Sequence, residues 1–193
     1  MKDRSELEIK ILKTTIKVFN EKGFKVTMSD IATGCGISKK TIYKVFNDKE
    51  DMFFEMVDYL FEGIKEEEKK VIEDETLSLD MKIRKIMGVM PESYMEIDFN
   101  KLHGLKDSFP QIYKRVEERL ESGWEGTIEL LEQGKKEGLI RSDANISIIK
   151  MMMESTLEHF FQRDVLIQND ISYQEGLERV VDIIVDGILV NRR

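Results

Sequence analysis

The chain has 193 residues, of which 41% are apolar and 35% are charged, with a net charge of −8 at neutral pH. This length can bury a core of one or two domains, and the proportions are typical of a soluble helical protein. A single cysteine excludes an intrachain disulfide, no apolar run approaches the ~18 residues that a membrane span needs, and the charged start does not resemble a signal peptide. We therefore expect a cytoplasmic protein with no membrane partner.

The charge is distributed unevenly along the chain. Residues 1–50 carry 11 Lys and Arg against 7 Asp and Glu, whereas residues 51–193 carry 19 against 31. A basic N-terminal segment on an acidic body would turn that segment toward a polyanion and keep the body away from it. This arrangement is compatible with double-stranded DNA as a partner.

The first predicted element is a helix over residues 6–22. Leu12, Ile16 and Phe19 recur at helical spacing on one face, and Gly23 follows as a residue that commonly ends helices. The face with these three side chains should lie inward.

Residues 27–46, TMSDIATGCGISKKTIYKVF, fit two short helices joined by a turn. Thr27 and Asp30 form a capping box that starts the first helix, and Gly36 suits a turn position with positive φ. Ser38 then caps the second helix. This order is that of a helix-turn-helix, which is typical of DNA-binding proteins.

The second helix, expected over residues 39–46, has an apolar and a cationic face. Ile42 and Phe46 fall on the apolar side at 100° per residue, with lysines opposite. In a major groove, Lys binds guanine acceptors or phosphate, hydroxyls donate to phosphate, and the helix N-terminus favours an anion. The alternative is a solvated helix face. The residues predicted to contact DNA here are Ser38, Lys39, Lys40, Thr41, Tyr43 and Lys44.

The pattern IAxxCGISxxTIYxxFxxKE over residues 31–50 resembles the N-terminal DNA-binding signature of TetR-type transcriptional regulators. The resemblance covers about the first third of the chain and agrees at several independent positions. Cys35 stands where the family usually has Ala, and Gly34 beside it would weaken the first of the two helices. The resemblance adds Thr27 and Lys49 to the predicted DNA contacts, with Lys49 near a phosphate; the alternative for Lys49 is a solvated first-turn lysine.

Further helices are expected along the rest of the chain. A capping box at Asp48 and Asp51 starts a linking helix that runs to about residue 70. The body should contain helices over 78–90, 110–137 and 172–190, an irregular helical stretch to residue 104, and an apolar helix capped by Asn145. The predicted fold is all-α, with about nine helices. Its parts are an N-terminal three-helix, helix-turn-helix DNA-binding domain over 1–50, a linking helix over 51–76, and a C-terminal helical ligand-binding and dimerisation domain over 77–193.

The last two predicted helices are too apolar for lone surface helices. Two arrangements explain this: they pair with a second copy as a four-helix bundle, which the resemblance also implies, or both face the core of one chain. The residues predicted to form a homodimer interface are Ile146, Ile149, Met153, Leu157, Leu177, Val181, Ile184 and Ile188.

Eleven methionines and the aromatic residues of the body suit an adaptable apolar cavity, although the same residues at helical spacing also fit an ordinary core. The resemblance implies an effector but carries over no ligand signature. We expect an unidentified small-molecule effector that is largely apolar. The residues predicted to line its cavity are Met87, Met90, Tyr94, Phe99, Phe109, Tyr113, Trp124, Met152 and Phe160.

The sequence contains no motif for catalysis or for a cofactor. GxSxG, P-loop, GxGxxG and paired-histidine patterns are absent, so we expect no cofactor, no metal site and no enzyme activity. The resemblance implies a homodimeric repressor that binds a palindromic operator and is released by a small ligand. The alternatives are a protein-interaction module with a vestigial DNA-binding head, a regulator that needs no ligand, and a helical enzyme, which would require paired titratable groups in a cavity.

Overall fold

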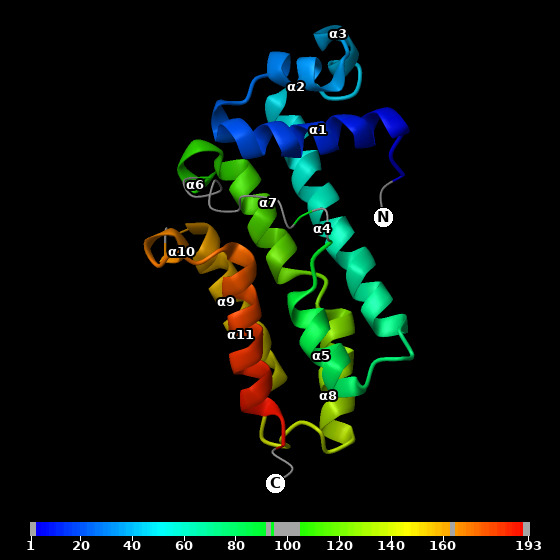
Figure 1. The fold of residues 1–193 in the computed structure, drawn as a ribbon, viewed down its shortest axis with the longest axis vertical. Coiled ribbons are helices and arrows are strands. Elements are labelled where there is room, and N and C mark those ends of the chain that lie inside the picture. The colour runs from blue at the N-terminus through cyan, green and yellow to red at the C-terminus, as the bar shows by residue number, and fades with distance from the viewer. Residues whose placement is uncertain (1–2, 92–93, 95–104, 163–164, 191–193) are drawn as a thin grey trace.

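Residues 3–91, 94, 105–162 and 165–190 are described by the computed structural model, and they form eleven α-helices and one 3₁₀ helix. A small N-terminal head lies across one end of a longer helical body (Figure 1). The all-α prediction is confirmed, and the four-residue helices α6 and α10 raise the number above the nine or so expected. The helices are α1 (Glu6–Lys22), the 3₁₀ helix η1 (Gly23–Lys25), α2 (Met28–Cys35), α3 (Lys39–Ile42), α4 (Lys49–Glu73), α5 (Leu79–Gly88), α6 (Leu105–Ser108), α7 (Pro110–Glu121), α8 (Glu125–Lys136), α9 (Ile146–Gln162), α10 (Val165–Gln168) and α11 (Tyr173–Ile188).

Side-chain caps start every α-helix of the head, the helix α4 that leaves it, and the last helix of the body, α11. Ser5, Thr27, Ser38, Asp48 and Ser172 each accept a hydrogen bond from the backbone N–H three residues later. Each cap satisfies a donor that the first turn of a helix leaves free. The predicted caps at Thr27, Ser38 and Asp48 are confirmed.

Two predicted helices end earlier than the sequence indicated. α3 ends at Ile42, and residues 43–45 continue as a turn in which the Val45 N–H donates to the Ile42 carbonyl at 2.9 Å. The single segment predicted over 110–137 is wrong, because Gly123 adopts a φ of 76° and separates α7 from α8. Only glycine enters that conformation without steric cost, so the chain turns there.

Two hydrophobic cores share the helix α4. The first core joins the head to the N-terminal half of α4 and to α6 and α7. The second core lies among α5, α8, α9 and α11, and the side chains of Leu157 and Tyr173 pack against both cores. α4, with 25 residues, therefore connects the head to the rest of the body along most of the length of the molecule (Figure 1).

The apolar residues of α9 and α11 that were predicted to meet a second copy face inward instead. All but Leu157 have exposed fractions between 0% and 9% within a single chain, and Leu157 lines an interior cavity. Their hydrophobic surface is already buried against α5 and α8, so that prediction is corrected: these side chains form the second core. The residues concerned are Ile146, Ile149, Met153, Leu157, Leu177, Val181, Ile184 and Ile188.

Within the described ranges, no helix is both long enough and apolar enough to cross a membrane. The same ranges hold no group of three or more His, Cys, Asp and Glu side chains that could bind a metal ion.

Candidate functional site

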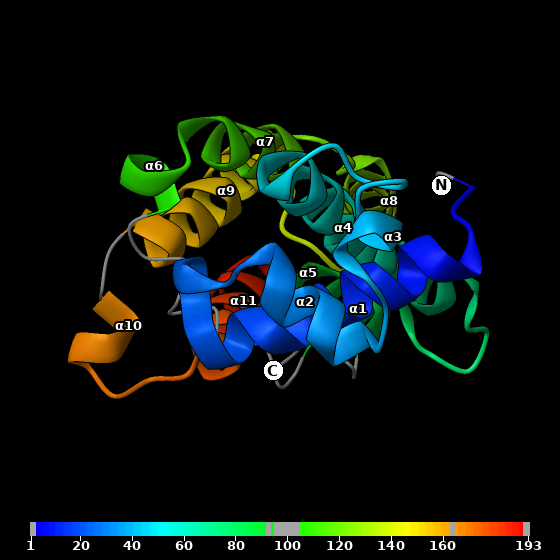
Figure 2. The ribbon, with the colours of Figure 1, turned by 90° about the horizontal axis from the view of Figure 1, so that it is seen from above.

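The second helix of the helix-turn-helix, α3, separates an apolar face from a cationic one. The helices α2 and α3 lie at the end of the molecule remote from the C-terminus (Figure 1), and Figure 2 shows the head from above. Ile42 and Phe46 are buried, with exposed fractions of 0% and 2%. Side chains of the opposite character are exposed on this segment, namely Lys39, Lys40, Tyr43 and Lys44. The predicted division of faces therefore holds although the α-helix is shorter than expected.

The turn before α3 is fixed by local hydrogen bonds. Gly36 adopts the left-handed conformation, with a φ of 67°, and its N–H donates to the Ala32 carbonyl. The Thr41 N–H donates to Ser38 Oγ at 3.1 Å, and the two hydroxyls lie 2.9 Å apart. The Ser38 and Thr41 hydroxyls, both predicted DNA contacts, thus already have partners within the helix cap.

Gly34 allows α1 and α2 to approach closely. A β-carbon at this position would lie 2.8 Å from Cγ2 of Thr14 and 3.4 Å from Cγ2 of Val18. The sequence indicated only a cost in helix propensity, whereas the structure shows a packing reason for glycine.

An ion pair joins the end of α1 to the capping box of α2. The Lys22 ammonium binds the Asp30 carboxylate, which also accepts hydrogen bonds from the N–H and hydroxyl of Thr27, at 2.9 and 2.7 Å. The hydrogen bonds from Lys22 and Thr27 lower the pKa of Asp30 to about 2. The Thr27 hydroxyl, another predicted DNA contact, therefore already has a hydrogen-bond partner within the cap.

Lys49 turns inward rather than outward. Its ammonium donates to the Phe24 carbonyl at 2.7 Å and lies 5.3 Å from the ring centroids of both Phe53 and Phe109. Burial lowers the pKa of Lys49. The predicted phosphate contact is corrected on this geometry: Lys49 ties the head to the start of α7. Phe109, predicted to line the cavity, belongs to this aromatic cluster instead.

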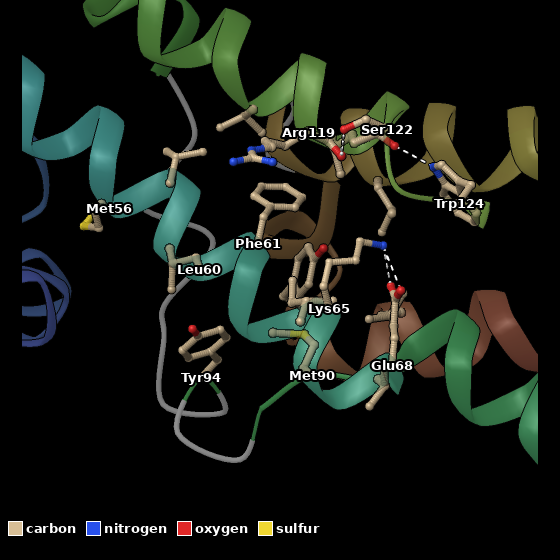
Figure 3. A pocket seen from close by; sticks show the side chains of 18 of the residues that line it. Met56, Leu60, Phe61, Lys65, Glu68, Met90, Tyr94, Arg119, Ser122 and Trp124 are labelled. Carbon is tan, nitrogen blue, oxygen red and sulfur yellow. Dashed lines mark hydrogen bonds and ion pairs between the residues drawn. The ribbon is translucent and has the colours of Figure 1, made fainter. Parts of the chain in front are cut away.

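An apolar cavity of about 140 Å³ lies between the two cores (Figure 3). Its wall comes from α4, α5, α7, α8 and α11, with one residue each from α6 (Leu105) and α9 (Leu157), and Phe19 and Phe24 contribute from the head. The cavity therefore borders both the head and the body.

Four of the nine residues predicted for the cavity lie on its wall. These are Met87, Met90, Tyr94 and Trp124. Tyr113 instead donates to Glu158 at 3.0 Å, Met152 is exposed, and Phe160 packs edge-on against Tyr173. Phe99 lies outside the described residues.

The helix α4 also lines the cavity, a contribution that was not predicted from the sequence. Met56, Leu60, Phe61 and Ile64 line it, and their spacing of three to four residues marks one helix face. That spacing was visible in the sequence, but it could not distinguish a cavity wall from a packed core.

Two charged groups at one side of the cavity neutralise each other. The Lys65 ammonium donates to both oxygens of Glu68, at 2.7 and 2.8 Å, and to the Gly123 carbonyl at 2.6 Å (Figure 3). Burial raises the pKa of Glu68 despite the opposing effect of Lys65. Nearby, the Trp124 indole donates to the Leu120 carbonyl at 2.7 Å.

A second charged cluster holds α4 against α7. Asp58 accepts hydrogen bonds from Nε and Nη2 of Arg115, at 2.7 and 2.8 Å, and from Nε of Arg119 at 2.8 Å. Burial alone would raise the pKa of Asp58, but the hydrogen bonds from both arginines outweigh it and the pKa is lowered. The same contacts raise the pKa of Arg115. Arg119 also lines the cavity, whereas Arg115 does not.

The fold and the head together define a DNA-binding regulator of the helix-turn-helix class. Residues 11–56 match the family model described as bacterial regulatory proteins, tetR family. The head of the chain therefore matches the N-terminal domain of this family.

Proteins similar to this chain along most of its length are also regulators. The Bacillus subtilis protein named as uncharacterized HTH-type transcriptional regulator YvaF is 23% identical over 182 residues, which cover 94% of this chain and 95% of that protein. The solved structure of the transcriptional regulator FadR from Bacillus subtilis in complex with stearoyl-CoA has a TM-score of 0.69 at 18% identity, covering 93% of this chain and 98% of that one. Regulatory protein TetR from Rhodobacter sphaeroides has a TM-score of 0.75 at 13% identity, covering 96% and 100% of the two chains.

Proposed function

We propose that the protein is a homodimeric transcriptional repressor that binds a palindromic operator through α3 and releases it when a small, largely apolar ligand fills the interior cavity. The observation that carries this proposal is the division of the α3 segment into a buried apolar face and an exposed cationic face. Because the apolar face of α3 packs against the rest of the head, the helix can enter a major groove without disturbing the packing that holds it.

Four exposed side chains on the head supply the proposed DNA contacts. Lys40 and Lys44 lie opposite the buried face and would bind phosphates or guanine acceptors. Lys39 and Tyr43 flank them. The hydroxyls of Thr27, Ser38 and Thr41 are engaged in caps, so we assign them to positioning of the two helices before any phosphate contact.

The proposed dimer uses the outer faces of α9 and α11, not the buried faces. Large apolar side chains are exposed there, including Ile183 at 72%. Exposed aliphatic side chains on two neighbouring helices are typical of a surface that another protein covers, and a two-fold axis would place the same surface on both partners. The side chains of this surface are Ile148, Met151, Met152 and Ile183.

The dimer has a direct test in Ile183→Glu. We expect this variant to sediment as a folded monomer, because a charge would be buried in the apolar contact. Ile72→Glu on α4, across the body from α9 and α11 (Figure 1), is the matched control and should stay dimeric. A dimeric Ile183→Glu protein would contradict the proposed surface.

Ligand release is supported by the position of the cavity. Phe19 and Phe24 of the head and Met87 and Leu177 of the body all border it, so a ligand that separates these walls changes how the head sits on the body. The ligand need only bind one arrangement better than the other to shift operator affinity. The stearoyl-CoA bound by the similar FadR structure supports an effector with an apolar chain.

Selection of bound sequences from a random duplex library tests the proposal as a whole. Recovery of a palindrome, bound as a dimer, is the expected result. Failure of the folded protein to enrich any sequence would contradict it and would favour a protein-interaction role for the exposed α9 and α11 surface. If a palindrome is recovered but no apolar compound changes the affinity of the protein for it, the protein is a DNA-binding regulator that needs no small ligand.

A further inference from the structure

Arg119 brings a cation with free hydrogen-bond donors to the wall of the apolar cavity. Its Nε donates to Asp58, and across the described part of the chain its two terminal nitrogens have no hydrogen-bond partner. Figure 3 shows the guanidinium beside Phe61, on the α7 side of the cavity. A guanidinium in such a position can still form two parallel hydrogen bonds to an anion.

Three charged side chains line the described wall of the cavity, namely Lys65, Glu68 and Arg119, and the first two neutralise each other. Arg119 shares Asp58 with Arg115, and Arg115 also pairs with Glu118, so the cluster behind the wall is neutral as a whole. On the wall itself, the terminal nitrogens of Arg119 are the cationic donors that have no partner among the described residues. A bound cation would lack a free carboxylate, because both oxygens of Glu68 accept from Lys65.

We infer that the ligand of this cavity is an organic anion: an apolar body that fills the space between the two cores, with one carboxylate or phosphate group held by the terminal nitrogens of Arg119. The inference rests on the proposed function, in which the cavity is the effector site. A cavity of about 140 Å³ is close to the ~150 Å³ of an engineered apolar cavity that binds benzene. The cavity therefore accepts about six carbon atoms, and a longer chain must move the side chains that line it.

Trp124 is the single tryptophan of the chain and borders the cavity, so its fluorescence reports occupancy directly. Four probes of equal chain length separate the effects of charge: octanoate, octyl phosphate, octanol and octylammonium. We expect at least one of the two anions to bind roughly tenfold more tightly than octanol, because a charged hydrogen bond is added to the same apolar contact. The better of the two identifies the head group as carboxylate or phosphate. Equal or weaker binding of both anions relative to octanol would overturn the inference.

Two glutamine variants separate charge recognition from structural support. Arg119→Gln and Arg115→Gln each remove one partner of Asp58, but only Arg119 reaches the cavity. We expect Arg119→Gln to lose the preference for the anion over octanol, and Arg115→Gln to retain it. If Arg119 had only a structural role, both variants would lose affinity for the anion and for octanol to the same extent. If Arg119→Gln does not fold, the preference of the wild-type protein within the probe series decides the question.

The DNA assay keeps this inference distinct from the proposed function. If an anion binds tightly but does not change operator affinity, the inferred ligand class is supported and the proposed release of DNA by the ligand is refuted. Operator binding without any Trp124 response to the four probes would refute the ligand class and leave the DNA-binding function standing.

Discussion

The carboxylate of Asp58 holds α4 against α7, and its removal should loosen the contact that connects the head to the cavity wall. Asp58→Ala leaves two guanidinium groups without their shared acceptor. Breaking a buried ion pair costs ~3–5 kcal/mol. The side chains of Arg115 and Arg119 are 25% and 29% exposed, so water compensates in part. We expect the free energy of unfolding to fall by about 2–3 kcal/mol, which lowers Tm by about 4–12 °C.

Urea and thermal unfolding of Asp58→Ala measure this loss, and Glu118→Ala is the matched control. Glu118 pairs with the same Arg115 but is 48% exposed, so its removal should cost less than about 1 kcal/mol. The ionised Asp58 stabilises the fold above its unfolded pKa of ~3.9. This contribution is lost as pH falls through the lower folded pKa. The difference between wild type and Asp58→Ala should therefore shrink below about pH 4. Equal losses in the two variants, or a difference that does not change with pH, would refute this account of the cluster.

Three further predictions concern the head. Phe46→Ala should lower the free energy of unfolding by about 3–5 kcal/mol, since Phe46 is 2% exposed, whereas Lys40→Ala should stay within about 0.5 kcal/mol of wild type; similar losses in urea titrations would contradict the division of faces. Asp30 should titrate by NMR near pH 2, because Lys22 and Thr27 bind its ionised form, and stability that depends on it should be lost only as pH falls toward that value; a midpoint near pH 4 would contradict the ion pair. Gly36→Ala should cost about 1 kcal/mol, because φ is 67° at this residue, and an unchanged urea midpoint would argue against the left-handed turn.

Local signals in the sequence predicted the head well. The caps at Thr27 and Ser38, the turn at Gly36 and the burial of Phe46 depend on neighbours within a few residues, and those neighbours are visible in the sequence. The lysine face followed from the same helical geometry. These features needed no knowledge of the rest of the fold.

The features that depend on tertiary packing were not predictable in the same way. Periodicity identified the apolar faces of α9 and α11, but it could not say whether a second copy or α5 and α8 would cover them. Lys49 was expected near a DNA phosphate, yet Phe24 and Phe109, both distant in sequence, provide its carbonyl and aromatic partners. The role of Arg119 likewise depends on Asp58 across the helix pair.

The salt dependence of operator binding, compared among lysine variants, tests the central claim most directly. Each lost phosphate contact should reduce the slope of log affinity against log salt by about 0.9. The structure predicts this reduction, once per protomer, for Lys40→Ala and for Lys44→Ala. It predicts no change for Lys49→Met, because the Lys49 ammonium binds the Phe24 carbonyl. A slope that falls for Lys49→Met and stays constant for the other two variants would contradict the assignment of the α3 face to DNA.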